Sequence, residues 1–261
     1  MIRIGTCGFS YKDWVGPFYP EGMPQAAMLG YYARTFDTVE LDYTYYVWPT
    51  TRTLESLATK VPENFLFSLK AHQSMTHDRE GLAEGALRYK AALTPLQERK
   101  MLAAVLLQFP TSFHNTPDNQ DYLTALRDAL ADLPLVVEFR HRDWVTQRVM
   151  ARLKEMQMAY CCVDQPRIST LVPPVAAVTA NLAYVRFHGR NAAKWFAHEE
   201  AWQRYDYTYT AEELEPWKEK IEAMEQQAPT VLIYANNHWK GQAIDTAKQL
   251  KLMLLPNSPP V

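Results

Sequence analysis

The sequence predicts a closed (β/α)8 barrel that spans residues 1–261 as a single α/β domain. Eight short runs rich in Val, Ile, Leu, Phe and Tyr alternate with helix-like stretches, the pattern of repeated β-α units around a parallel sheet. No Gly/Ser-rich linker or charge block interrupts this series. The length of 261 residues also suits one barrel, since such domains have about 250 residues.

The predicted strands comprise residues 2–5, 38–42, 65–70, 104–109, 135–140, 159–164, 183–188 and 230–236. Amphipathic helices are predicted over residues 26–35, 49–59, 82–100, 119–131, 146–157, 211–226 and 241–251. The sixth gap, residues 165–181, contains Pro166, Pro173 and Pro174 and is predicted as an irregular loop. An open, doubly wound sheet is the alternative, but residues 5–8 (GTCG) lack the G-x-G-x-x-G spacing of its phosphate turn.

Composition indicates a soluble protein. The chain is 48% hydrophobic and 21% charged, and 27 Lys and Arg against 29 Asp and Glu give a net charge of -2. This balance excludes a basic protein that coats nucleic acid or an anionic membrane. No apolar run approaches the roughly 18 residues of a membrane span, so no membrane partner is expected. Cys7, Cys161 and Cys162 lack C-x-x-C spacing, which indicates a reducing cytoplasm. No pattern predicts the oligomeric state.

Alternation along the strands predicts a polar barrel lumen, with residues such as Val39 and Leu41 facing the helices. Four cations and three anions are expected inside: Arg3, Lys70, Arg140 and Arg186 with Glu40, Asp42 and Glu138. A purely structural network of buried ion pairs needs the same balance of charge. A network of ion pairs with no chemical role therefore remains an alternative for the residues just below the strand ends.

Polar side chains also follow the strands, at the face where the active site of this fold forms. The residues expected to converge there are Lys70, Arg140, His141, Asp164, His188, Asn236 and Asn237, and Gln108 is expected to point into the lumen. Six of the seven Trp lie on the same side: Trp14, Trp48, Trp144, Trp195, Trp202 and Trp239. They are joined by Tyr11, Tyr45, Tyr46 and Tyr205. Aromatic faces beside cations suit a ligand with a ring and an anionic group, and loop anchoring is the alternative for any single Trp.

Seven ordered motifs resemble the domain of unknown function 72 (DUF72) family over nearly the whole chain. They are residues 5–20 (GTCGFSYKDWVGPFYP), 36–46 (FDTVELDYTYY), 65–70 (FLFSLK), 107–110 (LQFP), 137–140 (VEFR), 184–189 (YVRFHG) and 236–237 (NN). The chain departs from the usual family pattern at Cys7, Phe9, Asp42 and His238. The resemblance implies a TIM barrel and supplies candidate residues, but it implies no substrate.

Residues at the strand ends are compared with the needs of three chemistries known in barrel enzymes. A barrel glycosidase needs acids at the ends of the fourth and seventh strands, where this chain has Gln108 and His188. Lys70 suits a Schiff-base aldolase, but a phosphate-binding Lys has the same setting. A divalent metal would find ligands among Glu40, Glu138, Asp164, His141 and His188. Cations in the same layer would repel it, and His72 and His77 are expected to be solvated, so no cofactor is predicted and a divalent metal stays an alternative.

The remaining hypothesis is a hydrolase or lyase acting on a small phosphate-bearing, nucleotide-like substrate. The predicted catalytic residues are Glu138, His188, Lys70 and Glu40, with a Glu as base and His188 as acid. The predicted substrate-binding residues are Arg140, Arg186, Asn236, Asn237, Gln108, Tyr11, Trp14, Asp42, Tyr46 and Trp144. The competing hypothesis is a non-catalytic protein that binds a nucleotide or a single strand of nucleic acid.

Overall fold

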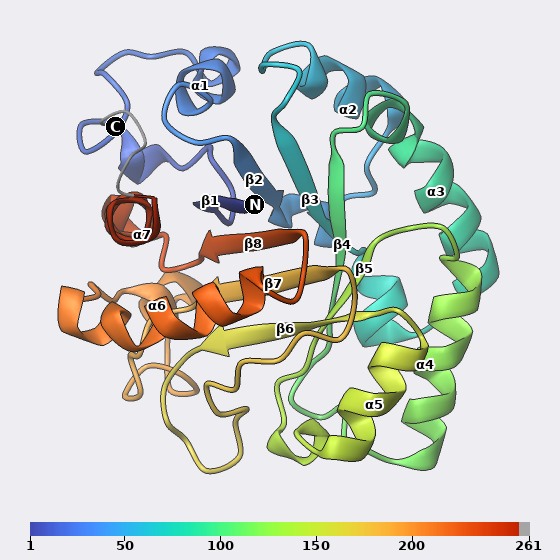
Figure 1. Cartoon of the computed structure of the whole chain (residues 1–261). Helices are drawn as coiled ribbons and strands as arrows, with labels where there is room; N and C mark the ends of the chain where they lie inside the picture. Colours follow the sequence, from blue (N-terminus) through green and yellow to red (C-terminus); the bar gives the residue numbers. More distant parts are fainter. Residues whose placement is uncertain (256–261) are drawn as a thin grey trace.

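Eight parallel strands form one sheet in the computed structural model, which describes residues 1–255 (Figure 1). The strands are β1 (Ile2–Thr6), β2 (Thr38–Leu41), β3 (Leu66–Lys70), β4 (Leu102–Gln108), β5 (Leu135–Glu138), β6 (Ala159–Asp164), β7 (Leu182–Phe187) and β8 (Thr230–Ala235). Their order is β1-β8-β7-β6-β5-β4-β3-β2, so every strand except those at the β1–β2 seam pairs with its sequence neighbours. The predicted strands are confirmed, with ends that shift by up to two residues.

The barrel closes between β1 and β2 with little backbone pairing. Cys7 forms an isolated parallel bridge with Glu40, and the N–H of Gly8 donates to the carbonyl of Glu40 at 2.7 Å. Below this bridge the Tyr32 hydroxyl accepts from the N–H of Thr6 at 2.9 Å and donates to the carbonyl of Thr38 at 3.1 Å. A side-chain hydroxyl therefore joins two strands where the ladder is interrupted.

Within residues 1–255, seven α-helices surround the strands (Figure 1). They are α1 (Gln25–Tyr32), α2 (Thr51–Ala58), α3 (Leu82–Glu98), α4 (Pro117–Ala129), α5 (Gln147–Glu155), α6 (Ala211–Glu225) and α7 (Gln242–Leu254). Threonines at the starts of α2, α4, α5 and α6 accept a hydrogen bond from the first turn, which offsets the unpaired N–H groups there. The segment between β6 and β7 contains no α-helix, as its prolines predict.

The core lies between the strands and the helices, as the alternation of side chains predicts. Val39 and Leu41 are 0% and 1% exposed on the helix side. Inside the barrel the Tyr234 hydroxyl lies 2.6 Å from Thr38 Oγ1 and 2.9 Å from Ser68 Oγ. The interior is therefore polar and closed by hydrogen bonds between side chains.

The described helices include none that is long and apolar enough to cross a membrane. The predicted domain extends to Val261, and residues 256–261 lie outside the described part of the chain.

Candidate functional site

Buried charged side chains gather at the carboxyl ends of the strands around Arg186, which is 1% exposed on β7. We call this group the Arg186 cluster, and its members are Cys7, Glu40, Asp42, Glu138, Arg140, Tyr184, Arg186 and His188. They come from β2, β5 and β7 or from the residues that directly follow β1, β2, β5 and β7. Alternation along each strand turns them inward, so residues distant in sequence meet in the lumen.

Arg186 occupies the centre of this cluster. Its Nη1 donates to Glu138 Oε2 at 2.6 Å and its Nη2 donates to Glu40 Oε1 at 2.6 Å. The same Nη2 lies 3.4 Å from Asp42 Oδ1. Burial opposes the positive charge, but these acidic neighbours hold the pKa of Arg186 well above its ordinary value. Arg186 is therefore a permanent cation that is already surrounded by anions.

Glu138 joins Arg186 to Arg140. Its Oε1 lies 2.7 Å from Arg140 Nε and 3.3 Å from His188 Nε2, and the carboxylate is fully buried. Burial favours protonation, but Arg140 and Arg186 hold the pKa of Glu138 well below its ordinary range. Glu138 is therefore an ionised bridge between two arginines, and its low pKa makes it a weak proton acceptor.

The pKa of Glu40 shifts in the opposite direction to that of Glu138. Burial raises the pKa of Glu40 to about 7, although Arg186 opposes this shift. Tyr184 donates a hydrogen bond to Oε2 of the same carboxyl group. A carboxyl group with a pKa near neutrality exchanges its proton readily at physiological pH, which is the property that general acid–base catalysis requires.

His188 is fully buried beside Glu138 and Arg140. Burial and the charge of Arg140 lower the pKa of His188 to about 3, while Glu138 opposes the shift. Asn236 Nδ2 lies 2.9 Å from His188 Nδ1, so Asn236 meets the imidazole inside the site. His188 is therefore neutral at physiological pH, which does not suit the predicted role of proton donor.

A second group of cations lies on the β3–β5 side of the same face. Lys70 Nζ lies 4.4 Å from the ring centre of Tyr45 and makes no salt bridge within residues 1–255. Burial, with added contributions from Lys70 and Arg140, lowers the pKa of His77 to about 4. Both cations therefore act on His77, and this region is electropositive.

The other predicted residues occupy different settings. Gln108 is 8% exposed and donates to the carbonyl of Phe109 at 2.7 Å. The Asn237 amide is buried and donates to the carbonyl of Tyr207 and to Thr246 Oγ1. Asn237 therefore holds the segments around β8 together. His72 is also buried, stacked on Trp48 at 4.2 Å, so its predicted solvation is wrong.

Of the predicted aromatic contacts, Trp14 and Trp144 are 0% and 1% exposed. Trp14 donates its indole N–H to the carbonyl of His238, and Trp144 donates to the carbonyl of Phe113. Both rings therefore anchor loops and present no free face. Tyr11 is half-buried and stacks on His238 at 4.6 Å, whereas Tyr46 is 72% exposed.

Two charged residues expected near the site have partners outside the Arg186 cluster. Arg3 lies at the opposite end of the barrel and pairs with Asp37 at 2.5 Å, so its predicted place in the charged lumen layer is wrong. Asp164 receives two hydrogen bonds of 2.8 Å from Arg190 and one from Trp217. These bonds tie β6 to the segment after β7 and leave Asp164 fully partnered.

The sequence did not single out Cys7, Tyr184 or Trp195 as site residues. Cys7 Sγ lies 3.3 Å from Arg186, and Trp195 lies 5.8 Å from Arg140. Tyr184 was recoverable because it precedes Arg186 by two residues and shares its face of β7. Trp195 lies in a long loop, where no periodicity predicts which side chains turn inward.

Cys7, Glu40 and Asp42 bring three potential metal ligands within 4.8 Å of one another. Arg186 Nη2 already contacts all three groups, so a guanidinium takes the position that a cation would need. Burial also raises the pKa of the Cys7 thiol, which disfavours the thiolate that binds metal. These residues do not fit a metal ion.

A cavity of about 550 Å³ opens on the β1–β2 side of the barrel. Its lining includes Gly8, Tyr11, Asp42 and Leu57, and it meets the Arg186 cluster only at Asp42. Lys70, Arg140 and His188 do not line it. We place the candidate site at the strand ends because the charged groups converge there.

Parallel strands closed into a barrel, with a charged cluster at their carboxyl ends, define a TIM-like barrel protein. The chain belongs to the DUF72 family, since the family model described as "Protein of unknown function DUF72" matches residues 3–260.

Individual relatives agree over almost the full length. The chain is 33% identical to the UPF0759 protein YunF of Bacillus subtilis (strain 168), covering 97% of this chain and 95% of the relative. A crystal structure of a DUF72 family protein from Thermotoga maritima MSB8 is 35% identical, with a TM-score of 0.90 over 97% of this chain and 99% of that one. A DUF72 family protein from Enterococcus faecalis V583 is 32% identical, with a TM-score of 0.87 over 97% and 95%. These relatives support the barrel and assign no activity.

Proposed function

We propose that the protein is an enzyme, a hydrolase or lyase, that acts by general acid–base chemistry on a phosphate-bearing, nucleotide-like substrate. One observation carries the proposal: charged side chains from several strands converge at the carboxyl face with incompletely satisfied polar atoms. Within the described residues, Arg186 Nε has no hydrogen-bond partner, and the contacts of Glu138 Oε1 with Arg140 Nε at 2.7 Å and with His188 Nε2 at 3.3 Å lack hydrogen-bond geometry. A network that only fills a barrel satisfies such atoms, so incompletely satisfied ones favour a ligand-binding role.

Lys70 and Arg140 are the groups that we assign to the substrate phosphate. Arg186 is enclosed by Glu40, Glu138 and Asp42, so it has little capacity left for a second anion. Arg140 shares its charge with Glu138 alone, and Lys70 contacts the ring of Tyr45. Arg offers a planar fork for phosphate oxygens and Lys a point charge, and the two together suit one phosphate group.

Glu40 is the group that we assign to proton transfer. Its pKa of about 7 lets the carboxylate accept a proton and the acid return it within one catalytic cycle. Asp42 is 25% exposed and its carboxylate lies within 4.8 Å of that of Glu40, so a carboxylate at the surface of the site neighbours the buried one. His188 then acts as a neutral hydrogen-bonding group rather than as the acid.

The exposed ring of Tyr46 supports a nucleotide-like substrate. It is 72% exposed and lies 4.8 Å from Tyr45, whose ring contacts Lys70. A base that stacks on Tyr46 would therefore carry its phosphate toward Lys70. Stacking of this kind contributes about 1 to 3 kcal/mol per base.

The same exposed ring favours a second candidate, a non-catalytic protein that binds a single strand of nucleic acid. A strand that contacts several cations releases counterions, so its affinity falls by several decades between about 50 and 200 mM salt. A small nucleotide held by Lys70 and Arg140 shows a much weaker dependence on salt. Binding assays at several salt concentrations separate the two candidates.

A thermal-shift panel tests the proposal directly. Nucleotides, sugar phosphates and inorganic phosphate are compared with the matching nucleosides and sugars. We expect phosphate-bearing compounds to raise the melting temperature more than their partners, because ligands that bind only the folded state stabilise it. Compounds that bind are then assayed for turnover.

Amino-acid substitutions test the roles proposed for Lys70 and Glu40. Lys70→Ala is expected to abolish the nucleotide-induced shift, while Lys154→Ala on the exposed face of α5 retains it. Glu40→Gln is expected to lower kcat by about 100-fold or more with binding retained, and Glu98→Gln at the end of α3 is the control. The proposal is wrong if no phosphate-bearing compound shifts the melting temperature, or if Lys70→Ala and His188→Ala leave a detected activity intact.

A further inference from the structure

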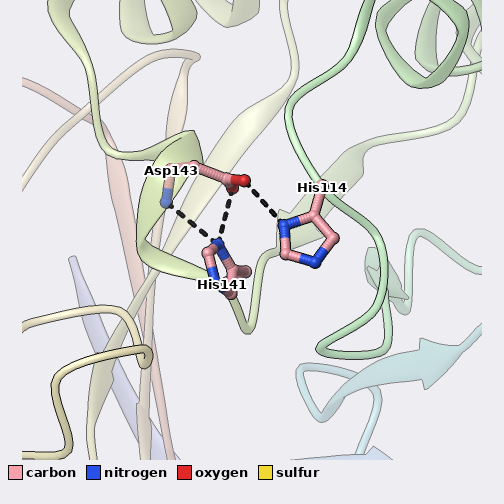
Figure 2. Close-up of side chains that lie close together, drawn as sticks. All are labelled: His114, His141 and Asp143. Carbon is pink, nitrogen blue, oxygen red and sulfur yellow. Dashed lines mark hydrogen bonds and ion pairs between the residues drawn. The ribbon is translucent and has the colours of Figure 1, made fainter.

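A second cluster of chemically active side chains lies near the carboxyl end of β5, outside the Arg186 cluster (Figure 2). It consists of His114, His141 and Asp143. His114 lies between β4 and α4, while His141 and Asp143 lie in the short segment between β5 and α5. Their side chains are 52%, 20% and 33% exposed, so solvent reaches the cluster.

The distances within this cluster match those between ligands of one metal ion. His114 Nδ1 lies 2.9 Å from Asp143 Oδ2, and His141 Nδ1 lies 3.0 Å from Asp143 Oδ1. Bonds of about 2.0 to 2.1 Å to a shared ion place neighbouring ligand atoms about 3.0 to 3.4 Å apart. The ligand atoms of all three residues lie within 4.8 Å of one another. A rotation of the half-exposed His114 ring would bring its ligand nitrogen closer to His141 Nδ1.

Two potential ligand atoms of this cluster lie close together. His141 Nδ1 accepts a hydrogen bond of 3.4 Å from the backbone N–H of Asp143 and lies 3.0 Å from Asp143 Oδ1 (Figure 2). Asp143 Oδ1 is buried and has no partner of hydrogen-bond geometry within residues 1–255. A cation bound at this oxygen would supply the partner that it lacks.

Neighbouring contacts fix the segment around His114 relative to the segment around Asp143. Asn115 Nδ2 donates to the carbonyl of Asp143 at 3.0 Å, and Trp144 Nε1 donates to the carbonyl of Phe113 at 2.6 Å. The rings of Phe113 and Trp144 also stack at 5.2 Å. The residues on either side of His114 are therefore attached to Asp143 and to the residue that follows it, so the cluster is preorganised.

The charge around the cluster also favours a cation. Asp143 pairs with no Lys or Arg within the described residues. Arg142 turns away and donates to the carbonyl of Ser169 at 2.9 Å. This setting differs from the Arg186 cluster, where a guanidinium fills the centre.

We propose that His114, His141 and Asp143 form a site for a divalent transition metal, with Zn²⁺ as the ion that two imidazoles and one carboxylate match best. Three protein ligands leave further coordination positions to water. The ion links the segment before α4 to the segment before α5 on the face that carries the Arg186 cluster. The sequence pointed to His141 alone, because only the fold brings His114 and Asp143 beside it.

Calorimetric titration of the tag-free, metal-depleted protein with Zn²⁺ tests this site, and Co²⁺ supplies a visible spectrum of the coordination sphere. We expect one ion per chain, with an affinity that falls as the pH is lowered, because protons compete with the metal for the ligand atoms. His114→Gln and Asp143→Asn should each weaken binding by at least tenfold and change the Co²⁺ spectrum. His198→Gln, a histidine outside the cluster, should leave both unchanged.

Circular dichroism checks that each variant folds, and His114→Gln is the safer of the two because its side chain is half exposed. Zn²⁺ should also raise the melting temperature of the unmodified protein more than that of His114→Gln. The proposal is overturned if Zn²⁺ does not bind at submillimolar concentration. It is equally overturned if binding persists unchanged in folded His114→Gln and Asp143→Asn.

Discussion

Glu138 is the residue on which the charged lumen depends most. It contacts Arg140, Arg186 and His188 and is completely buried. Its carboxylate neutralises Arg140 and Arg186, whose side chains are almost completely shielded from bulk water. Removing one partner of a buried pair costs far more than the pair contributes, because the remaining charge stays buried and unpaired.

Glu138→Ala should therefore lower the free energy of unfolding by about 3 to 5 kcal/mol. Urea denaturation at pH 7 measures this change, and Glu138→Gln should lose less because it keeps the volume and one acceptor. An exposed glutamate, Glu98, provides the matched Glu→Ala control. A loss below about 1 kcal/mol for Glu138→Ala would show that Arg140 and Arg186 are satisfied without this carboxylate.

His188 should make the protein sensitive to mild acid. Its pKa is about 3 in the folded chain against 6.5 in the unfolded chain, so the unfolded state binds more protons between these values. The resulting stability is fully present above pH 6.5 and is lost as the pH falls toward 3. Between pH 7 and pH 5 this contributes a loss of about 1 to 2 kcal/mol.

His188→Asn should flatten this part of the stability curve, measured by urea denaturation between pH 7 and pH 5. His198→Asn serves as the control because His198 lies outside the cluster. An unchanged slope in His188→Asn would mean that His188 is protonated inside the folded barrel or that other groups set the acid response.

At the scale of elements, the weakest join of the barrel is the seam between β1 and β2. The hydroxyl of Tyr32, on α1, takes the place of a ladder hydrogen bond between Thr6 and Thr38. Gly5 permits this close approach, since a Cβ there would lie 2.1 Å from the carbonyl oxygen of Thr38. Cys7 and Glu40 follow directly above the seam, so seam geometry also positions the site.

Tyr32→Phe should destabilise the fold by about 1 to 3 kcal/mol, because it leaves a buried N–H and a buried carbonyl without their partner. Tyr31→Phe, the next residue on the same helix, is the matched control. Hydrogen exchange should show faster exchange of the Thr6 amide in Tyr32→Phe alone. Equal protection in both variants would mean that the hydroxyl does not hold the seam.

Strands and helices were predictable from sequence because burial on two sides of a barrel strand produces a regular pattern. Runs such as residues 159–164 are apolar on the helix side, and the gap with Pro166 lacks a helix in the structure as in the prediction. Strand ends were less certain, because β5 stops at Glu138 while the pattern continues to Arg140.

The site was predictable only in part. Alternation identifies the face on which Glu40, Glu138 and Arg186 lie, but it does not give the depth or the partners of a side chain. Trp14 and Trp144 therefore looked the same as an exposed aromatic residue, although both anchor loops. The cluster of His114, His141 and Asp143 depends on the conformations of the loops after β4 and β5, which no sequence periodicity predicts.

At the scale of the whole molecule, the net charge of -2 is near neutral. The carboxyl face of the barrel nevertheless has an acidic side and a basic side. Around Arg186, the carboxylates of Glu40, Asp42 and Glu138 outnumber the two arginines of the cluster. Toward β3 and β5, Lys70 and Arg140 create the positive potential that His77 experiences. An anionic substrate should therefore bind on the Lys70 side, at the end of the strand that pairs with the Glu40 strand.

The most direct test of this account is a crystal structure of the protein soaked with the nucleotide that gives the largest thermal shift. We expect the phosphate to lie at the strand ends, within hydrogen-bond distance of Lys70 and Arg140, with no equivalent density in Lys70→Ala crystals. Ligand bound only on the helical exterior of the barrel would contradict the assignment of the active site to the carboxyl face.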